Sequence, residues 1–345
     1  MLVAGKWTDD SQSIQTKDPK GGFVRPTSAF RNWVTPNGEP GPTGRGGFAP
    51  EAGRYRLFVS LSCPWASRTV IARKFKKLEE VLPVSVVEPA QTKQGWRLCG
   101  DGAADHDVGG DDERYLHAFY SRADPNFTGR ATVPVLWDTS ANTIVNNESA
   151  EIVRMLNSGF GALADNSIDL YPEALRSEID RRNERIYARL NNGVYRAGFA
   201  TSQRAYGEAF GGVFGMLDEL EFHLATRRLL VGERVTEADI RLFVTLIRFD
   251  PVYHSLFKCN LRRLSDYEAL SAYVRRLLDI PAFHESVDMD HIKRGYYSIT
   301  ALNPNGIVPL GPDLPALGFP AEGVAPILPG VVQTAPTKGT STRQE

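Results

Sequence analysis

The chain has 345 residues, of which 42% are hydrophobic and 23% are charged, and its formal net charge is −1. This composition is typical of a globular protein with room for two ordinary domains, and the balanced charge argues against nucleic acid or a membrane surface as a partner. No apolar run could span a membrane, no signal-peptide core opens the sequence, and three scattered cysteines form no disulfide framework, so a cytoplasmic location is predicted.

The two ends of the chain differ in composition from its middle. Residues 1–50 are rich in glycine and proline, which predicts an irregular N-terminal arm. The aromatic residues Phe23, Phe30 and Trp33 indicate that this arm lies against the rest of the protein. Residues 313–345, rich in proline, threonine and glycine, are predicted to form an extended, disordered tail.

A strand, a turn and a helix are predicted between residues 54 and 78, with Cys63 in the turn. Residues 54–60 are rich in strand formers, and Pro64 suits the first turn of a helix, where its missing N–H costs nothing. A cysteine at a helix N-terminus meets free N–H groups and the positive end of the dipole, which predicts a reactive thiol with a pKa below the ordinary value of about 8.5. The alternative is a small buried cysteine; Ser62 and Pro64 beside it favour the reactive thiol.

Further strands and helices complete an α/β pattern up to about residue 165. A second strand is predicted at residues 83–88, and a long insertion with a short helix at 114–122 follows it. The next strand, residues 131–138, contains Pro134, so either it is demoted to an edge strand or the Val133–Pro134 bond is cis. A strand at 143–145 and a helix opened by Asn147 come next. The order β-α-β-(α)-β-β-α predicts a thioredoxin-like domain over residues 51–165.

Helical periodicity dominates from residue 170 to residue 312, which predicts a second, all-helical domain. One helix start is specific: Thr236 and Asp239 form a reciprocal capping pair, and Val235 and Ile240 form a hydrophobic staple. Pro251 is expected to end or kink that helix. Other helices are predicted at residues 175–190, 204–228, 271–278 and 290–297. The histidines and cysteines have no metal-ligand spacing, so no metal is expected.

Several short motifs resemble the glutathionyl-hydroquinone reductases, the Xi class of glutathione transferases. They are Ser62-Cys-Pro-Trp-Ala-Ser-Arg, Gly129-Arg-Ala-Thr-Val-Pro-Val-Leu-Trp-Asp, Asn146-Asn-Glu-Ser, Thr236-Glu-Ala-Asp-Ile-Arg-Leu-Phe and Asp290-His-Ile-Lys-Arg-Gly-Tyr-Tyr. The resemblance covers roughly residues 20–312, and the sequence departs from it within Leu98–Asp112, an acidic and glycine-rich segment, and again after Pro312. It implies the glutathione transferase fold, a thioredoxin-like domain before an all-helical one, and a homodimer.

The resemblance also implies that glutathione is the co-substrate and that Cys63 is the nucleophile. The Cys63 thiolate would attack the thioether sulfur of a glutathionyl-hydroquinone, release the hydroquinone and remain as a mixed disulfide with glutathione. A second glutathione would resolve this disulfide and leave as glutathione disulfide. The residues agree with such a cycle: position 66, three after Cys63, is alanine, and a monothiol without a CxxC partner needs an outside thiol to turn over.

The roles of other residues follow from the resemblance. Tyrosines of the helical domain would act at the thiol: Tyr195 as acid or base for the leaving phenolate, and Tyr253 and Tyr296 as hydrogen-bond donors that favour the thiolate. Val133 would pair with the glutathione backbone, and Ser149 would hold the γ-glutamyl carboxylate at a helix N-terminus. The full glutathione site would be formed by Trp96, Arg130, Thr132, Val133, Glu148 and Ser149. Without the resemblance, the three tyrosines would be interpreted as packing residues, and Glu148 and Ser149 as helix-capping residues.

Two other functions stay open from the sequence. One is an omega-like thiol transferase or dehydroascorbate reductase, which would use the same Cys63. The other is a non-catalytic glutathione-transferase-like module that serves protein contacts. The intact Cys63, Val133-Pro134 and Glu148-Ser149 argue against that module, because a scaffold needs no turn that poises a thiol. A quinone-sized apolar pocket lined by tyrosines would favour the hydroquinone reductase.

Overall fold

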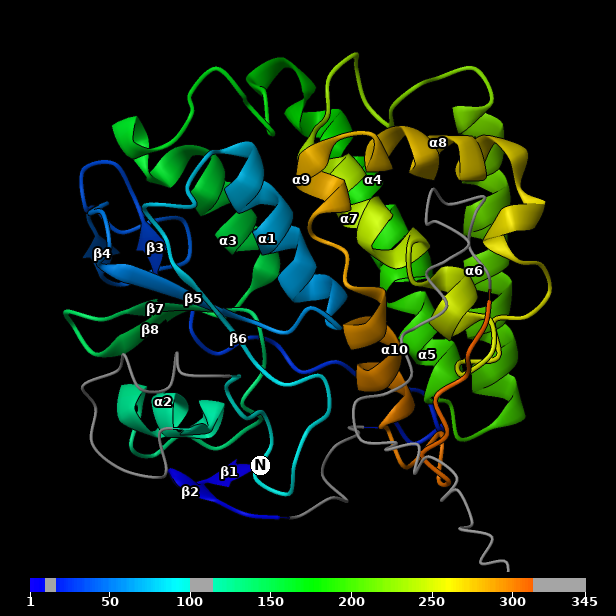
Figure 1. Ribbon diagram of the computed structural model, residues 1–345, viewed down its shortest axis with the longest axis horizontal. Coiled ribbons are helices and arrows are strands. Elements are labelled where there is room, and N and C mark those ends of the chain that lie inside the picture. The colour runs from blue at the N-terminus through cyan, green and yellow to red at the C-terminus, as the bar shows by residue number, and fades with distance from the viewer. Residues whose placement is uncertain (10–16, 100–113, 313–345) are drawn as a thin grey trace, which may run out of the picture.

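The computed structural model describes residues 1–9, 17–99 and 114–312. The tail 313–345 and most of the acidic segment at 98–112, on which two of the predictions fall, therefore lie outside the described residues. A mixed α/β half and an all-helical half lie side by side (Figure 1). This confirms the predicted fold class.

A four-stranded sheet and three helices form the α/β half. Their bounds are β5 Tyr55–Val59, α1 Pro64–Phe75, β6 Val84–Val86, α2 Leu116–Ala123, β7 Val135–Asp138, β8 Thr143–Asn146 and α3 Ser149–Arg154. The strand order is β6-β5-β7-β8, in which β5 is parallel to β6 and antiparallel to β7, and β7 is antiparallel to β8. Helices α1 and α3 cover one face of the sheet, and α2 lies on the other (Figure 1).

Strand β5 is an inner strand and delivers the chain to the active-site turn. Leu57, Phe58 and Val59 are each fully buried, and Leu57 lies opposite both Val84 and Leu136 in the sheet. A strand covered on both faces is hydrophobic at consecutive positions, which is the pattern of this segment. The turn that follows β5 therefore starts from a rigid, buried support.

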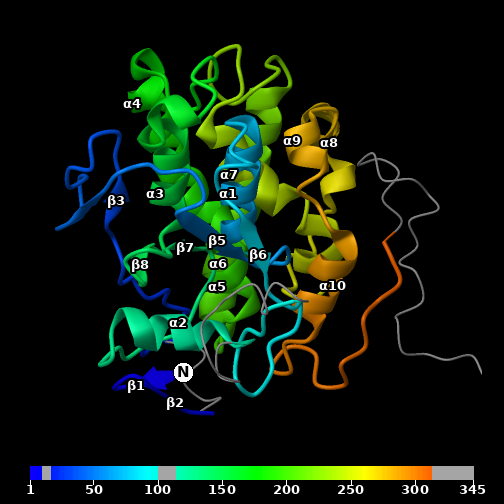
Figure 2. The same cartoon turned by 60° about the vertical axis from the view of Figure 1, so that its left-hand side comes forward.

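The all-helical half packs against the sheet half through α1. Its helices are α4 Arg176–Ile186, α5 Gly193–Gly198, α6 Gln203–Leu224, α7 Glu237–Leu246, α8 Glu268–Leu278, α9 Pro281–His284 and α10 Met289–Tyr297. Helices α7 and α9 both contact α1, and α10 lies next to the start of α1 in both views (Figures 1 and 2). The N-terminus of α1 therefore lies at the boundary of the two halves.

The local signals at the element ends are confirmed. Helix α1 begins at Pro64, the Val133–Pro134 bond is cis, and β7 begins directly after it. The predicted capping pair opens α7: Asp239 Oδ2 accepts a hydrogen bond from the Thr236 N–H at 2.9 Å. Helix α7 ends at Leu246, and Pro251 lies in a π-helical turn, Phe249–Tyr253, that follows it. The short helices α5 and α9 were not predicted.

The N-terminal arm contains only short pieces of regular structure. Two short pairs form in it, β1 Leu2–Val3 with β2 Lys6–Trp7 and β3 Trp33–Val34 with β4 Gly47–Phe48. Apart from these two-residue strands, the described part of the arm contains no helix and no longer strand. As predicted, the arm lies against the protein, and it touches both halves: the Asn32 N–H donates to Val145 O at 2.9 Å, and the Thr201 N–H donates to Gly21 O at 3.0 Å.

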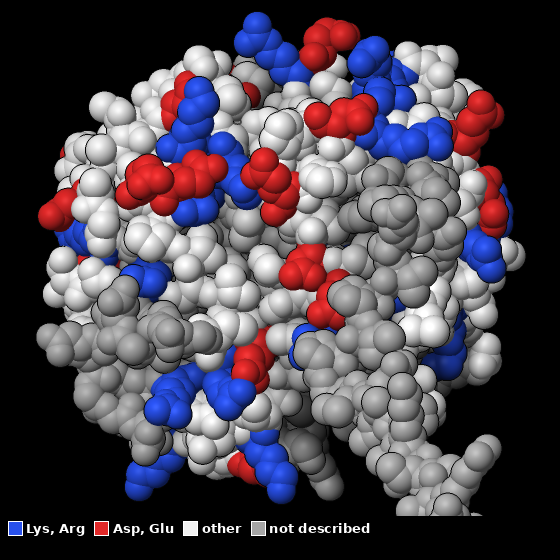
Figure 3. Space-filling model, in the orientation of Figure 1, with Lys and Arg blue, Asp and Glu red and all other residues white. Residues whose placement is uncertain are grey.

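The molecular surface carries charges of both signs. On the face shown in Figure 3, acidic and basic side chains are interspersed over the described residues. No helix in the described part of the chain has the length and apolar character needed to cross a bilayer.

Candidate active site

Cys63 occupies the turn between β5 and α1 as the sequence predicts. It is the N-cap residue of α1, with extended backbone angles, and Pro64 takes the first helical position. Its side chain is partly exposed, and Sγ donates a hydrogen bond to Val133 O over 3.6 Å. The thiol therefore lies between the helix N-terminus and the loop that contains the cis proline.

A buried arginine from the helical half fixes the backbone of this turn. Arg248 follows α7, is 1% exposed, and donates from Nε to Ser62 O at 3.0 Å. Its Nη2 donates to Leu61 O at 2.9 Å and to Ser67 Oγ at 2.7 Å. These bonds satisfy carbonyl groups that would otherwise be buried without a partner, and they place a positive charge behind the Cys63 thiol.

Helix α10 approaches the same turn from the other side. A Cβ atom added to Gly295 would lie only 2.5 Å from Ser62 Cβ, closer than any ordinary contact. Glycine therefore lets the backbone of α10 touch the turn before Cys63. The next residue in the helix is Tyr296.

The three predicted tyrosines are brought together by the fold. Tyr296 lies at the centre: its hydroxyl is 2.6 Å from the Tyr195 hydroxyl and 2.8 Å from the Tyr253 hydroxyl. Burial is the main cause that raises the pKa of Tyr195, and the nearby Cys63 charge adds to it. Burial also holds the pKa values of Tyr253 and Tyr296 well above the ordinary value. All three phenols therefore stay protonated near neutral pH and can donate hydrogen bonds.

The acidity of Cys63 differs from the sequence-based prediction. Burial raises the pKa of the Cys63 thiol, although the N–H groups of Ala66 and Trp65 and the charges of Arg248 and Arg25 all oppose this rise. The helix N-terminus thus acts in the predicted direction, but the aromatic surroundings remove more solvent than expected. The prediction of a lowered pKa is wrong for the protein without glutathione.

The loop with the cis proline is held by a buried tyrosine. The Tyr120 hydroxyl donates to Thr132 O at 2.9 Å and accepts from the Thr132 N–H at 3.2 Å. The Asn147 side-chain amide also donates to that hydroxyl at 3.0 Å. Thr132 therefore supports the loop through its backbone, and Val133 directs its carbonyl group toward Cys63.

Glu148 and Ser149 open α3, as predicted, and both have partners. Glu148 Oε1 accepts from the Ala150 N–H at 3.2 Å, and its Oε2 accepts from Ser28 Oγ of the arm at 2.9 Å. Ser149 Oγ accepts from Arg68 Nη1 at 3.5 Å. Arg68 belongs to α1, is 2% exposed and lies over the Trp65 ring, 4.4 Å from its centroid. A buried guanidinium thus lies beside the helix N-terminus that is predicted to bind a carboxylate.

The remaining two predicted residues are Trp96 and Arg130. Trp96 is partly buried against the core in the loop that follows β6, where its carbonyl accepts from the Leu116 N–H at 2.9 Å. Burial, with the charge of Arg25 as a second cause, lowers the pKa of Arg130. Arg130 and Arg25 are therefore electrostatic neighbours.

Comparison with known proteins identifies the family. The N-terminal domain of glutathione S-transferases matches residues 62–158, and the C-terminal domain of the same family matches residues 187–276. The chain is 49% identical to the glutathionyl-hydroquinone reductase YqjG of Escherichia coli, over 90% of this chain and 94% of that protein. It is 47% identical to the glutathionyl-hydroquinone reductase PcpF of Sphingobium chlorophenolicum, over 92% of this chain and 98% of that protein. The chain belongs to the glutathionyl-hydroquinone reductases.

Solved structures agree with this assignment to the Xi class of glutathione transferases. The glutathione-bound structure of YqjG superposes with a TM-score of 0.79 at 47% identity, covering 90% of this chain and 95% of that one. The glutathione transferase Xi of Phanerochaete chrysosporium gives a TM-score of 0.80 at 44% identity, covering 88% and 97%.

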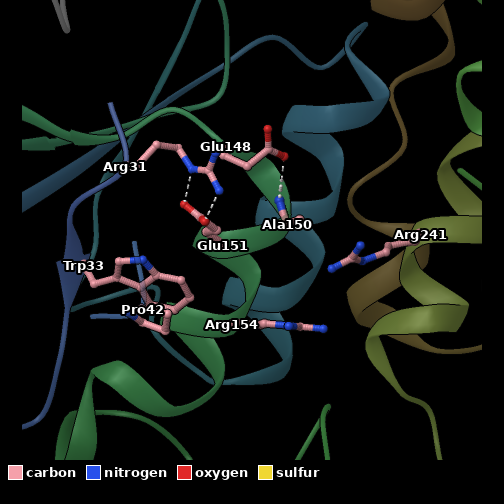
Figure 4. A pocket seen from close by; sticks show the side chains of 8 residues that line it. All are labelled: Arg31, Trp33, Pro42, Glu148, Ala150, Glu151, Arg154 and Arg241. Carbon is pink, nitrogen blue, oxygen red and sulfur yellow. Dashed lines mark hydrogen bonds and ion pairs between the residues drawn. The ribbon is translucent and has the colours of Figure 1, made fainter. Parts of the chain in front are cut away.

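A cavity of about 420 Å³ adjoins the glutathione site that the family resemblance predicts. Ala150 of α3 and Glu148, the N-cap residue of that helix, line it on one side, and Arg241 of α7 points toward it from the opposite side (Figure 4). Cys63 is not among its lining residues, so this cavity is not the thiol pocket. No cluster of side chains that could hold a metal ion occurs among the described residues.

Sequence reasoning did not assign a function to Arg25, Arg68 or Arg248. The role of each of these arginines depends on the residues that it contacts in the folded protein. Arg68 lies within the first family motif, which was a usable signal. The other two carry no local signal, because they come from the arm and from the end of α7.

The raised thiol pKa leads to a prediction on pH dependence. In this reductase family member without ligand, we expect Cys63 alkylation by iodoacetamide to accelerate with pH through a midpoint above that of free cysteine, about 8.5. The reason is that burial favours the neutral thiol, so the thiolate forms only at higher pH. Mass spectrometry of the peptide with Cys63 separates its reaction from that of the exposed Cys99. A midpoint at or below neutral pH would contradict the prediction.

Proposed function

We propose that the protein is a glutathione-dependent reductase that removes glutathione from glutathionyl-hydroquinones. The observation that carries this proposal is the placement of a single thiol at the N-terminus of α1, close to three hydrogen-bonded phenols. A thiol without a neighbouring cysteine suits a cycle resolved by glutathione, and phenols that stay protonated suit a leaving group with oxygen substituents. The activity after which YqjG and PcpF are named supports the same proposal.

The proposed chemical step balances without an outside oxidant. The Cys63 thiolate forms an S–S bond with the glutathione sulfur while the bond from that sulfur to the aromatic carbon breaks. The electron pair of the broken bond goes to the ring carbon, which takes a proton, so the hydroquinone leaves with a C–H bond. A second glutathione thiolate then attacks the mixed disulfide, which yields glutathione disulfide and restores the Cys63 thiolate.

We assign the roles of the site residues as part of this proposal. Tyr195 exchanges a proton with the phenolic oxygen of the substrate, while Tyr253 and Tyr296 stabilise the thiolate through their hydrogen-bonded cluster. The Val133 backbone pairs with the cysteinyl unit of glutathione. Ser149 holds its γ-glutamyl carboxylate. The other members of the proposed glutathione site are Trp96, Arg130, Thr132 and Glu148. Support comes from the position of Val133 beside Cys63 and of Glu148 and Ser149 at the start of α3.

The test is a direct comparison of substrates in the presence of glutathione. The purified full chain is incubated separately with glutathionyl-menadiol, hydroxyethyl disulfide and dehydroascorbate. The glutathione disulfide that forms is measured through glutathione reductase. We expect kcat/KM for glutathionyl-menadiol to exceed the others roughly a hundredfold, because only this substrate uses both the thiol and the phenols. Preference for hydroxyethyl disulfide or dehydroascorbate would instead favour the omega-like function, which relatives named omega-like glutathione transferases make the second candidate. No turnover of any substrate would favour the non-catalytic module.

We also propose that the protein is a cytoplasmic homodimer with domains at residues 51–165 and 170–312. The resemblance to the family supports the dimer, and cysteines that remain free support a reducing compartment. In sedimentation velocity, we expect a species of about twice the chain mass of 38.1 kDa. A monomer at every concentration would end the dimer proposal without affecting the proposed activity.

A further inference from the structure

The N-terminal arm places an arginine among the aromatic residues of the site. The guanidinium of Arg25 lies 4.7 Å from the ring centroid of Trp65 and 4.7 Å from that of Tyr195. Trp65 is two residues after Cys63, and Tyr195 belongs to the phenol cluster. Its Nε donates to Asn192 Oδ1 at 2.9 Å, which fixes the orientation of the side chain. The Arg25 side chain is therefore fixed in place and is not a mobile surface arginine.

One nitrogen of this guanidinium has no partner. Arg25 Nη2 is buried from solvent and makes no hydrogen bond. Among the described residues, no carboxylate lies within ion-pair distance of Arg25, whereas its neighbour in the arm, Arg31, pairs with Glu151 of α3. A buried donor without an acceptor is costly, so its retention points to an acceptor that arrives with a ligand.

Two cations act on the thiol from the described part of the chain. Arg25 and Arg248 both act electrostatically on Cys63, and Arg25 also acts on Arg130. A partly desolvated region with two cations beside a thiol attracts anions. Of these residues, Arg248 already donates to the turn, so Arg25 is the cation with a donor to spare.

We propose that Arg25 is an anion-binding residue of the active site, which uses Nη2 to hold an oxyanion of the bound glutathionyl substrate beside Cys63. The oxyanion is either the phenolate oxygen of the hydroquinone or a glutathione carboxylate; both offer a charged oxygen to a planar guanidinium. The proposal adds an anion-binding residue to the site of the proposed reductase, and it rests on the proposed function for the identity of the substrate. The arm thereby contributes to the site from outside both predicted domains.

The first experiment tests anion binding without using catalysis. The probes are iodoacetate, an anion, and iodoacetamide, its neutral counterpart; the ratio of their alkylation rates at Cys63 cancels changes in the thiol pKa. At low ionic strength, we expect Arg25→Gln to lower this ratio roughly three- to tenfold, and Arg25→Lys, which keeps the charge, to stay near the wild-type ratio. Arg45→Gln removes an exposed charge from the same arm and should leave the ratio unchanged.

A second control separates loss of the anion site from loosening of the arm. Ser202→Ala removes the hydrogen bond from Ser202 Oγ to Lys20 O and the cap of α6, but leaves Arg25 in place. Arg25→Gln should lower the ratio of the two alkylation rates, whereas Ser202→Ala should lower only the melting temperature. An unchanged ratio in Arg25→Gln, or an equal fall in Ser202→Ala, overturns the proposal.

The two sources of the oxyanion are distinguished by turnover. If the phenolate is held, Arg25→Gln lowers kcat/KM with glutathionyl-menadiol but not with the mixed disulfide of glutathione and mercaptoethanol. If a glutathione carboxylate is held, it lowers kcat/KM with both, through a higher KM. If Arg25→Gln lowers kcat/KM with neither substrate, the proposal is overturned. Should the wild-type protein not turn over glutathionyl-menadiol, the proposed function fails, while the alkylation ratio still decides on Arg25.

Discussion

Replacing Cys63 with serine is expected to lower the reduction of glutathionyl-menadiol at least about 10³-fold. Serine has nearly the same size and can still hydrogen-bond to the Val133 carbonyl, which the Cys63 thiol contacts in the native protein. Its hydroxyl, however, stays protonated at neutral pH and cannot form a disulfide with glutathione. Glutathione binding, measured by calorimetry, should therefore change little while turnover is lost.

The matched control for this variant is Cys99→Ser, because Cys99 is a free and exposed cysteine. It should keep wild-type turnover. Mass spectrometry after a single turnover should find the glutathione adduct on Cys63 in this control and none in Cys63→Ser. Full activity in Cys63→Ser would move the nucleophile to another residue and end the proposed cycle.

Replacing Arg248 with methionine is expected to have the second-largest effect, on stability and activity together. The change leaves the carbonyl groups of Ser62 and Leu61 buried without a donor, which should cost about 2–4 kcal/mol in the free energy of unfolding. It also removes a positive charge that opposes the high pKa of Cys63. Urea unfolding measures the first effect, and the pH dependence of alkylation measures the second.

Two further variants test how Arg248 acts. Arg248→Lys keeps the charge but cannot bridge the same acceptors, so it should restore most of the alkylation profile and only part of the stability. Ser67→Ala removes one acceptor of Arg248 and should cost about 1 kcal/mol. If Arg248→Met unfolds at the wild-type urea concentration, the arginine does not fix the turn. If its alkylation midpoint is unchanged, the arginine does not influence the thiol.

The fold was predictable wherever the chain carries a short-range signal. Pro64 starts α1, Pro134 immediately precedes β7, and the Thr236–Asp239 pair starts α7, since each acts through bonds within a few residues of itself. Helices α5 and α9 have six and four residues, too short for a periodic pattern. They form because neighbouring helices cover them, and no local sequence pattern predicts this packing.

The site was predictable for residues that share motifs with the family, and not for the residues that support them. Cys63, Tyr296 and the opening of α3 lie within such motifs, whereas Tyr195 and Tyr253 were named from the family resemblance without a motif of their own. Arg248 lies far from Cys63 in sequence and meets it only through the packing of α7 on α1. The direction in which the pKa of Cys63 shifts depends on how much solvent the packing of the two halves excludes from the thiol. Residue propensities near position 63 could therefore not predict that direction.

The close contact at Gly295 sets a boundary for redesign of the substrate range. Because the backbone of α10 packs directly against the Ser62 side chain and close to the Pro89 carbonyl oxygen, the approach of Tyr296 to the turn depends on the absence of a side chain at position 295. Enlarging residue 295 would shift α10 away from the thiol before it changed the pocket. Libraries aimed at larger or smaller aromatic substrates should therefore vary Phe23 of the arm and Phe199 at the end of α5, which pack beside Tyr195, and leave the contact between α10 and the turn intact.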